Sequence, residues 1–448
     1  MDSIWTAETQ IEKRDPLPGD TGTAAVVIGA GLAGILTAYY LGQEGIPTVV
    51  LEADRIGSGQ TKNTTAKITS QHGLIYDRLI RTFGRRMGEQ YARANEAAIR
   101  EYERLIREKG IDCDFVRCPA CLYSRREEDA LRREARAASS LGIAASFESS
   151  GELPFPVAGL TRFEGQARFQ PLKFLGRMAE EVTVYEQTRV LRVEGNRVET
   201  ARGSVTAEHI IFASHYPFIN VPGFYFARMY QERSYVTALQ GACALEGMYL
   251  GIDRDGLSFR SQGDVLLMSG GSHRTGRNRQ GGQYEKLRSA ARSFFPGSHE
   301  VAHWSAQDCM TPDQIPYIGR FSARRPDWYI LSGFGKWGMT TAMAGARILA
   351  ALVSGRDCPE AEIFSPQRRL TARALKELAI HGAHTARGLG KHLLPAGGHG
   401  VTLNCPHMGC RLEWNQEEET WDCPCHGSRF DREGRLIDDP AQTDLRKK

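Results

Sequence analysis

The chain of 448 residues is 41% hydrophobic and 25% charged, proportions that are ordinary for a globular protein of two or three domains. Its formal net charge is only +4, which argues against a nucleic-acid-binding groove and against a polybasic membrane patch. The N-terminal segment carries early acidic side chains and no apolar core. We therefore expect no secretory signal peptide and a cytoplasmic protein.

The N-terminal region predicts a βαβ unit. A strand is expected at Ala24–Ile28, a helix at Gly31–Glu44 and a second strand at Thr48–Leu51. The longest apolar run of the chain, from Ala24 to Gly42, lies in the same region, but glycines interrupt it. A buried strand–turn–helix is therefore favoured over a membrane span.

A glycine-rich turn joins the strand and the helix of this unit. Gly29, Gly31 and Gly34 form a GxGxxG pattern, and Glu52 ends the next strand. The first glycine permits a tight turn, the second lets a pyrophosphate approach the backbone, and the third allows close packing of helix and strand. The carboxylate of Glu52 can accept hydrogen bonds from ribose hydroxyls. The pattern indicates a dinucleotide site but does not separate FAD from NAD, and a turn without a ligand stays an alternative.

The remaining chain predicts a mixture of helices and short strands. A long amphipathic helix is expected at Arg86–Lys109, with Gly110 as its stop. The later elements, in chain order, are short β-runs with turns from Val182 to about Trp304, a strand at Trp328–Leu331, a helix at Met339–Leu352 and a basic, partly helical connector at Ser365–Pro395.

The C-terminal tail concentrates cysteine and histidine. Cys405 and His407 form a C-x-H pair, and Cys423 and His426 form a C-x-x-H pair. Two thiolates for one iron and two imidazoles for the other are the donors of a Rieske 2Fe–2S cluster. A structural zinc site and a metal-free remnant are the two alternatives.

Several motifs outside the tail resemble one flavoprotein superfamily. Residues 51–61 and 63–67, the Thr-Pro-Asp at 311–313 and the segment 332–339 are similar to the FAD-dependent oxidoreductases of the D-amino-acid oxidase/glycine oxidase superfamily, over roughly residues 22–360. The resemblance implies FAD rather than NAD. The residues that it places at the cofactor are Gly29, Gly31, Gly34, Glu52, Ala53, Arg55, Thr61, Thr64, Thr65, Val190, Gly333, Gly335, Lys336, Gly338 and Met339.

The second glycine-rich turn of this set leads into the helix expected at Met339–Leu352. Its backbone N–H groups, the helix dipole and Lys336 would stabilise negative charge on the flavin pyrimidine ring, although a close-packed turn against the sheet fits the same glycines. Some members of the superfamily tether the flavin through a cysteine five residues before the Thr-Pro-Asp. That position is Ala306 here, so we expect non-covalent FAD.

The tail resembles the Rieske proteins of cytochrome bc complexes, and the match extends to Trp414, Trp421 and the segment 427–430. This resemblance implies a disulfide between the extra cysteines, Cys410 and Cys425, and places Ser428 to bond a cluster sulfur. A full Rieske domain carries several strands before its first ligand, whereas only residues 397–404 precede Cys405 here. Either the base of the domain is trimmed, or the FAD domain supplies the missing packing surface.

The two resemblances together imply an α/β, Rossmann-like FAD domain with an α+β substrate domain and a small all-β Rieske module. The expected boundaries are an N-terminal arm at 1–21, an oxidoreductase domain at 22–360, a linker at 361–396 and a shortened Rieske module at 397–448. Within the oxidoreductase domain, FAD-binding segments are expected at about 22–85, 160–215 and 305–360, and substrate-domain segments at about 86–159 and 216–304.

The implied activity is an amine or amino-acid dehydrogenase. A small-molecule substrate would give a hydride to the flavin, and the cluster would pass single electrons to an external protein or small-molecule acceptor. The alternative is an electron-transfer or redox-sensing protein without a small-molecule substrate. A Rieske oxygenase is disfavoured, since such enzymes need a separate mononuclear iron and lack the extra cysteine pair. No acid–base side chain stands out, and no nucleic acid or membrane span is expected.

Two further features carry less weight. Cys118 and Cys121 have redox-motif spacing but lack a thioredoxin-like context, so a structural role is favoured. Arg228, Arg233 and Arg274 could clamp a carboxylate bidentately, although solvated arginines are the default expectation.

Overall fold

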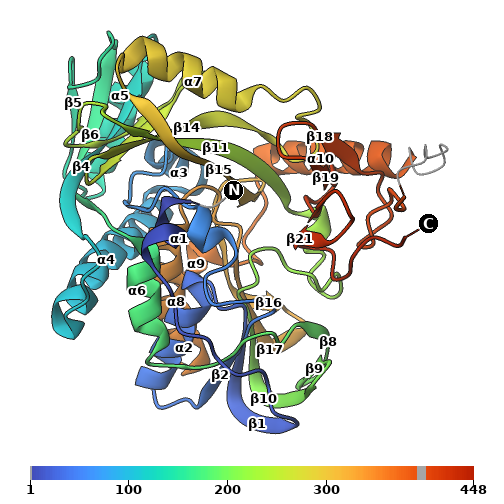
Figure 1. Ribbon diagram of the computed structural model, residues 1–448. Coiled ribbons are helices and arrows are strands. Elements are labelled where there is room, and N and C mark those ends of the chain that lie inside the picture. The colour runs from blue at the N-terminus through green and yellow to red at the C-terminus, as the bar shows by residue number, and fades with distance from the viewer. Residues whose placement is uncertain (1–2, 391–399, 448) are drawn as a thin grey trace.

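The computed structural model describes residues 3–390 and 400–447, and Figure 1 shows the arrangement of its elements. The expected junction between linker and Rieske module, at residues 396 and 397, lies outside the described residues. The described chain contains three β-sheets, of which the third is small and lies near the C-terminus. This agrees with the expected fold class.

The first sheet is the dinucleotide-binding layer. Its strand order is β16-β17-β10-β1-β2-β7, and the neighbours from β17 to β7 pair in parallel. The apolar run that suggested a membrane span is the buried end of β1 followed by α2. The strands are β1 (Thr21–Ile28), β2 (Thr48–Leu51), β7 (Thr183–Tyr185), β8 (Val190–Glu194), β9 (Arg197–Thr200), β10 (Gly203–Phe212), β16 (Tyr317–Ser322) and β17 (Arg325–Ser332).

The helices of this half pack on the first sheet and on one another. The long helix ends where Gly110, at φ +60°, adopts the left-handed conformation that favours glycine. Helix α2 packs against α8, and α4 packs against α8 and α9. The helices are α1 (Ile4–Glu8), α2 (Leu32–Gln43), α3 (Tyr76–Phe83), α4 (Arg85–Lys109), α6 (Pro171–Ala179), α8 (Gly338–Val353) and α9 (Ala361–Phe364), with a 3-10 turn η1 (Gln60–Asn63).

The second sheet forms the other half of the oxidoreductase part, with strand order β15-β11-β14-β13-β12-β4-β6-β3 and β5 paired with β6. The region expected to hold only strands and turns also contains helix α7, whose buried Tyr284, Leu287 and Ala291 follow helical spacing. The elements are β3 (Lys67–Ile68), β4 (Val116–Ser124), α5 (Glu128–Ser140), β5 (Ala145–Glu148), β6 (Gly159–Arg168), η2 (Tyr225–Ala227), β11 (Tyr230–Gln240), β12 (Met248–Gly251), β13 (Ser258–Gln262), β14 (Val265–Arg274), α7 (Gln283–Phe294) and β15 (His299–Met310).

The third sheet belongs to the C-terminal module. Its four short antiparallel strands are β18 (Glu413–Asn415), β19 (Thr420–Asp422), β20 (Arg429–Phe430) and β21 (Leu436–Asp438). Helix α10 (Ala372–Gly390) precedes the module, and Figure 1 shows this helix beside the small sheet. Over the described residues, no helix combines the length and apolar character needed to cross a bilayer.

Candidate functional site

The glycine-rich turn after β1 is shaped by close backbone contacts. Gly29 has φ +107°, and a Cβ atom at this position would lie 2.8 Å from the carbonyl oxygen of Ala213. A Cβ atom on Gly34 would lie 1.8 Å from the carbonyl oxygen of Gly29. Both positions therefore exclude any side chain. The N-terminus of α2, which Gly31 caps, lines a cavity, and the Leu32 N–H donates to the Thr61 hydroxyl at 3.1 Å. A helix N-terminus in such a wall fits a phosphate.

Glu52 follows β2 and lies beside the same turn. Its carboxylate accepts hydrogen bonds from the backbone N–H groups of Ala30, at 2.7 Å, and Asp54, at 2.9 Å. Burial raises the pKa of Glu52, and these two bonds oppose that shift. The carboxylate is thus held in place by the backbone while it lines a cavity, an arrangement that fits a ribose.

One cavity of about 980 Å³ connects these features. Arg55 is not part of its wall, because its guanidinium pairs with Glu186 at 2.8 Å and donates to the carbonyl oxygen of Ile11 at 2.8 Å. Gly34 does not line the cavity either, because it packs against the backbone of Gly29 beneath the turn. The predicted cofactor residues that do line the cavity are Gly29, Gly31, Glu52, Ala53, Thr61, Thr64, Thr65, Val190, Gly333, Gly335, Lys336, Gly338 and Met339.

The second glycine-rich turn lies between β17 and α8. Gly333 and Gly335 have φ +73° and +56°, and a Cβ on Gly333 would lie 2.5 Å from Thr311. Lys336 extends from the turn toward the second sheet, where its Nζ donates to Ser234 at 2.6 Å and pairs with Asp308 at 3.3 Å. The backbone N–H groups of this turn fit the edge of a flavin ring. The charge of Lys336 is already balanced by the carboxylate of Asp308.

The Thr-Pro-Asp motif ties the connector to the oxidoreductase part. Asp313 accepts hydrogen bonds from Nε and Nη2 of Arg368, both at 2.7 Å, and the two side chains are only 5% and 3% exposed. Burial would raise the pKa of Asp313, but the Arg368 guanidinium holds it below its usual value. Arg368 also donates to the carbonyl oxygens of Pro316 and Ile315. This motif is therefore a structural clamp outside the cavity wall.

The two ligand loops of the C-terminal module converge on one buried point. The thiols of Cys405 and Cys423 lie within hydrogen-bonding reach of each other, and Ser428 bonds the Cys405 thiol. The rings of His407 and His426 lie with their centroids 4.9 Å apart. Within the described part of the chain, neither ring nitrogen of the buried His426 has a hydrogen-bond partner, nor does Nδ1 of His407. Orphaned ring nitrogens beside paired thiols fit the donor set of a 2Fe–2S cluster.

The extra cysteines behave differently from the paired thiols. Cys410 and Cys425 form a disulfide, the pairing that the resemblance implied. Their sulfurs lie close to Cys423, but a disulfide sulfur is not available as a thiolate ligand. Helix α10 covers this bond: a Cβ on Gly388 would lie 2.5 Å from the Cys425 sulfur. The bond is therefore buried beneath the helix.

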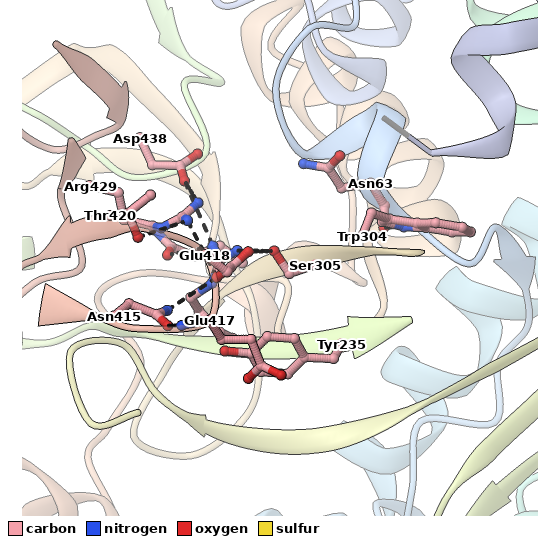
Figure 2. A network of polar contacts seen from close by, with 12 residues as sticks. Asn63, Tyr235, Trp304, Ser305, Asn415, Glu417, Glu418, Thr420, Arg429 and Asp438 are labelled. Carbon is pink, nitrogen blue, oxygen red and sulfur yellow. Dashed lines mark hydrogen bonds and ion pairs between the residues drawn. The ribbon is translucent and has the colours of Figure 1, made fainter. Parts of the chain in front are cut away.

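A buried network of charges fixes the module to the second sheet, with Glu418 at its centre (Figure 2). This carboxylate pairs with Arg233 of β11 at 2.6 Å and with Arg429 of β20 at 3.3 Å, and it accepts a hydrogen bond from Ser305 of β15. Burial would raise the pKa of Glu418, but the two guanidiniums hold it at about 2. Arg429 also pairs with Asp438 at 2.9 Å. Of the two alternatives for the short module, a trimmed base or a packing surface supplied by the FAD domain, these contacts fit the second, because the second sheet packs against the module.

Two further contacts extend this docking surface. Glu417 accepts hydrogen bonds from the backbone N–H groups of Gln283, at 2.9 Å, and Tyr284, at 2.7 Å, and so caps the N-terminus of α7. At the other end, Arg274 donates to the carbonyl oxygens of Pro424 and Cys425. The module is held at both ends of its contact with the sheet.

Two buried glutamines join the second sheet to the second ligand loop. Nε2 of Gln231 donates to the carbonyl oxygen of His426 at 2.8 Å, and Nε2 of Gln307 donates to that of Gly427 at 2.8 Å. The Gln231 amide oxygen also lies 3.2 Å from Nε2 of His215, which lines the cavity. The cavity and the ligand loop are therefore separated by one amide side chain along this route.

The module itself closes part of the cavity. Asp439 lies 3.6 Å from Arg189 of the oxidoreductase part, and Asp438 accepts a hydrogen bond from Gln60 at 3.0 Å. The sequence did not predict these wall residues, because the Cys/His ligand motifs do not indicate which other part of the chain the module contacts. The module residues in the wall are Glu418, Thr420, Arg429, Leu436, Ile437, Asp438, Asp439 and Gln442.

The arginines considered as a carboxylate clamp lie elsewhere. Arg233 and Arg274 hold the C-terminal module, and Arg228 stacks on Tyr317 and donates to the carbonyl oxygen of Pro366. None of the three lines the cavity. The default expectation for these arginines was a solvated side chain. Arg233 is instead buried and Arg274 half-buried, because the module covers them.

Cys118 and Cys121 have the spacing of a redox motif but do not form a disulfide. Both are free, buried cysteines of β4 that pack in different apolar clusters. Burial raises the pKa of the Cys121 thiol to about 12. A reactive thiolate is disfavoured there, which agrees with a structural role.

Comparisons with known proteins agree with this geometry. Residues 24–352 match the family model of FAD dependent oxidoreductases, and residues 398–447 match that of the Rieske [2Fe-2S] domain. The chain belongs to the FAD dependent oxidoreductase family. Bacillus subtilis YhfW, named as a Rieske 2Fe-2S iron-sulfur protein, is 34% identical over 490 aligned residues, with 98% of this chain and 96% of that protein covered. The oxidoreductase therefore binds FAD and, through its Rieske domain, a 2Fe–2S cluster.

Solved structures share the fold of the family at low identity. L-proline dehydrogenase from P. horikoshii has a TM-score of 0.65 and 19% identity, and the likeness covers 78% of this chain and 98% of that one. Glycine oxidase from Geobacillus kaustophilus has a TM-score of 0.64 and 19% identity, covering 78% and 100%.

Proposed function

We propose that this oxidoreductase is an amine or amino-acid dehydrogenase that passes electrons from FAD to the Rieske cluster and on to an external acceptor. The observation that carries the proposal is the shared wall: the Rieske module lines the FAD cavity and is locked to the second sheet by buried charges. A module held this way keeps its cluster at a constant distance from the flavin. The structural relatives named as a proline dehydrogenase and a glycine oxidase support a substrate with a carbon next to nitrogen.

We assign the cluster ligands to Cys405, His407, Cys423 and His426, and the cofactor contacts to the cavity-lining residues described above. Bound FAD accepts a hydride from the substrate, and the bound cluster carries one electron at a time. The protein then has to orient the substrate, exclude water and connect the two sites. The His215–Gln231–His426 contacts form a hydrogen-bonded connection between the cavity and the ligand loop.

The exit toward the acceptor lies at His407. His426 is 1% exposed, whereas His407 is partly exposed and has Nε2 3.0 Å from Oδ1 of Asn220. An external acceptor, protein or small molecule, therefore meets the His407 side of the cluster site. We further propose a cytoplasmic location, in which α10 shields the Cys410–Cys425 disulfide from thiol reductants.

The decisive experiment mixes the oxidised holoprotein anaerobically with a panel of amines and amino acids. Flavin bleaching followed by the EPR signal of a reduced Rieske cluster is the expected result. A Cys423→Ser variant without the cluster should still bleach with substrate but should no longer reduce the acceptor. Bleaching only by a reductase partner, with every panel member inert, would replace the dehydrogenase with the electron-transfer or sensing function.

A further inference from the structure

A lysine of the cavity wall has no role in the cofactor contacts described above. Lys67 lies on β3, two residues after the predicted cofactor residue Thr65, and it lines the cavity. Its Nζ donates to the backbone carbonyl oxygen of Tyr249 at 2.9 Å and to the hydroxyl of Ser258. Both partners belong to the second sheet, so the ammonium faces the part of the cavity that this sheet encloses.

The charge of Lys67 is not balanced by the protein. Throughout residues 3–390 and 400–447, no carboxylate lies within ion-pair distance of its Nζ. The adjacent Arg260 is fully buried and donates to the carbonyl oxygens of Ala66, at 2.9 Å, and Phe169, at 3.2 Å, again without an acidic partner in the described chain. Two neighbouring cations without a counter-ion are costly inside a protein. An anion in the cavity would relieve that cost.

The titration of Lys67 is consistent with such a site. Burial first, and the Arg260 guanidinium second, lower the pKa of Lys67 to about 7. The thiols of Cys118 and Cys121 on β4 face the same group, and burial raises the pKa of both. Any anion that binds Lys67 would stabilise the ammonium and so draw a proton from solvent.

We propose that Lys67 anchors the carboxylate of an amino-acid substrate in the cavity. The inference rests on the proposed function, whose substrate class it narrows from amines to amino acids. Lys336 is the other lysine that the second sheet holds in this wall, but Asp308 and Glu232 already balance it. Arg254 also lines the cavity, yet it is exposed on the loop after β12. Among the described wall residues, Lys62 is a second lysine without an ion pair, but it lies on η1 and makes no hydrogen bond to the second sheet. Lys67 is therefore the unpaired cation that the second sheet fixes in the enclosed space.

The test measures carboxylate binding to the oxidised holoprotein by titration calorimetry, with acetate, propionate and benzoate as probes. Lys67→Met should weaken the Kd by roughly 10- to 100-fold, the value of a charge-assisted hydrogen bond. Lys67→Arg should restore binding to within a few-fold. At pH 8, above the pKa of about 7, binding to the unmodified protein should take up a proton, seen as a dependence of the heat on the buffer.

Arg254→Met is the matched control, because it removes the same charge from the exposed rim and should change the Kd by less than about 3-fold. Unchanged binding in Lys67→Met, equal losses in both variants, or no carboxylate binding by the unmodified protein would each overturn the inference. These titrations need no electron transfer, so their outcome is separate from that of the dehydrogenase experiment. With an active substrate, Lys67→Met should raise KM for the amino acid far more than for the amine that lacks its carboxylate.

Discussion

The side-chain amide of Gln231 lies 2.8 Å from the carbonyl oxygen of His426. The first residue belongs to the sheet that encloses the cavity, and the second is a proposed iron ligand 195 residues further along the chain. This hydrogen bond is one of those that join the flavin half of the molecule to the loop that holds the cluster, and the bond from Gln307 to Gly427 is another. The Gln231 amide also donates to the carbonyl oxygen of Asp439 at 2.9 Å.

Replacing Gln231 by leucine should disturb the cluster without emptying the flavin site. The change removes the donor from one buried and one partly buried carbonyl oxygen, at a cost of roughly 1–3 kcal/mol. We expect shifted EPR g-values and slower cluster reduction after the flavin has bleached, measured by rapid freezing. Gln240→Leu, at the exposed end of the same strand, is the control and should match the unmodified protein. Identical cluster spectra in Gln231→Leu would contradict the proposed contact.

Acid should undock the module through Glu418. The folded pKa of this group is about 2, below its ordinary 4.5, so its stabilisation is complete above pH 4.5 and is lost as the pH falls toward 2. The shift corresponds to on the order of 3 kcal/mol. Glu418→Gln should remove that acid dependence and destabilise the protein at neutral pH, because Arg233 loses its nearest carboxylate. Glu419→Gln, whose side chain is 66% exposed, should leave the acid transition in place when both are followed by circular dichroism.

Helix α10 offers a paired test of the buried disulfide. A Cβ on Gly388 meets the Cys425 sulfur at 2.5 Å, whereas one on Gly382 meets nothing within 4 Å. Gly388→Ala should lift the helix and speed reduction of Cys410–Cys425 by dithiothreitol. Gly382→Ala, on the exposed face, should instead stabilise the helix by about 0.5–1 kcal/mol. Equal reduction rates in the two variants would show that the helix does not protect the bond.

The clamp between Asp313 and Arg368 should matter for stability more than for the spectrum of the flavin. Arg368→Leu leaves a buried carboxylate without its partner, which costs about 3–5 kcal/mol. The expected result is a clear fall in Tm with the flavin spectrum retained. The neighbouring Arg369 is exposed, and Arg369→Leu should leave Tm nearly unchanged. A fall of equal size in both variants would mean that the clamp contributes nothing specific.

The cofactor should leave the protein on denaturation. Ala306 occupies the position of the tethering cysteine and lines the cavity, while the nearby Cys309 is buried outside the wall. Precipitation with acid should release FAD into the supernatant, where absorption and mass measure it. Yellow colour in the pellet would indicate a covalent bond.

Sequence reasoning reached those parts of the site that short motifs encode. Short stretches of sequence predict the glycines of the first turn, Glu52 and the paired Cys/His ligands. A tight turn or a set of metal donors restricts residues that are neighbours in the chain, so the pattern is visible without the fold. The docking surface could not be read in this way. Arg233 and Glu418 are separated by 185 residues, and only the tertiary fold brings them together. Nothing local to Arg233 distinguishes a substrate clamp or a solvated side chain from the buried ion pair that it forms with Glu418.

The cover that α10 forms over the disulfide also bears on how the protein matures. The helix precedes the module in the chain, yet it packs on the joined sulfur atoms of Cys410 and Cys425. The bond removes from the module two thiols that could compete with Cys405 and Cys423 for iron. The packed helix keeps solvent thiols away from that bond, so it also protects the choice of ligands during cluster assembly.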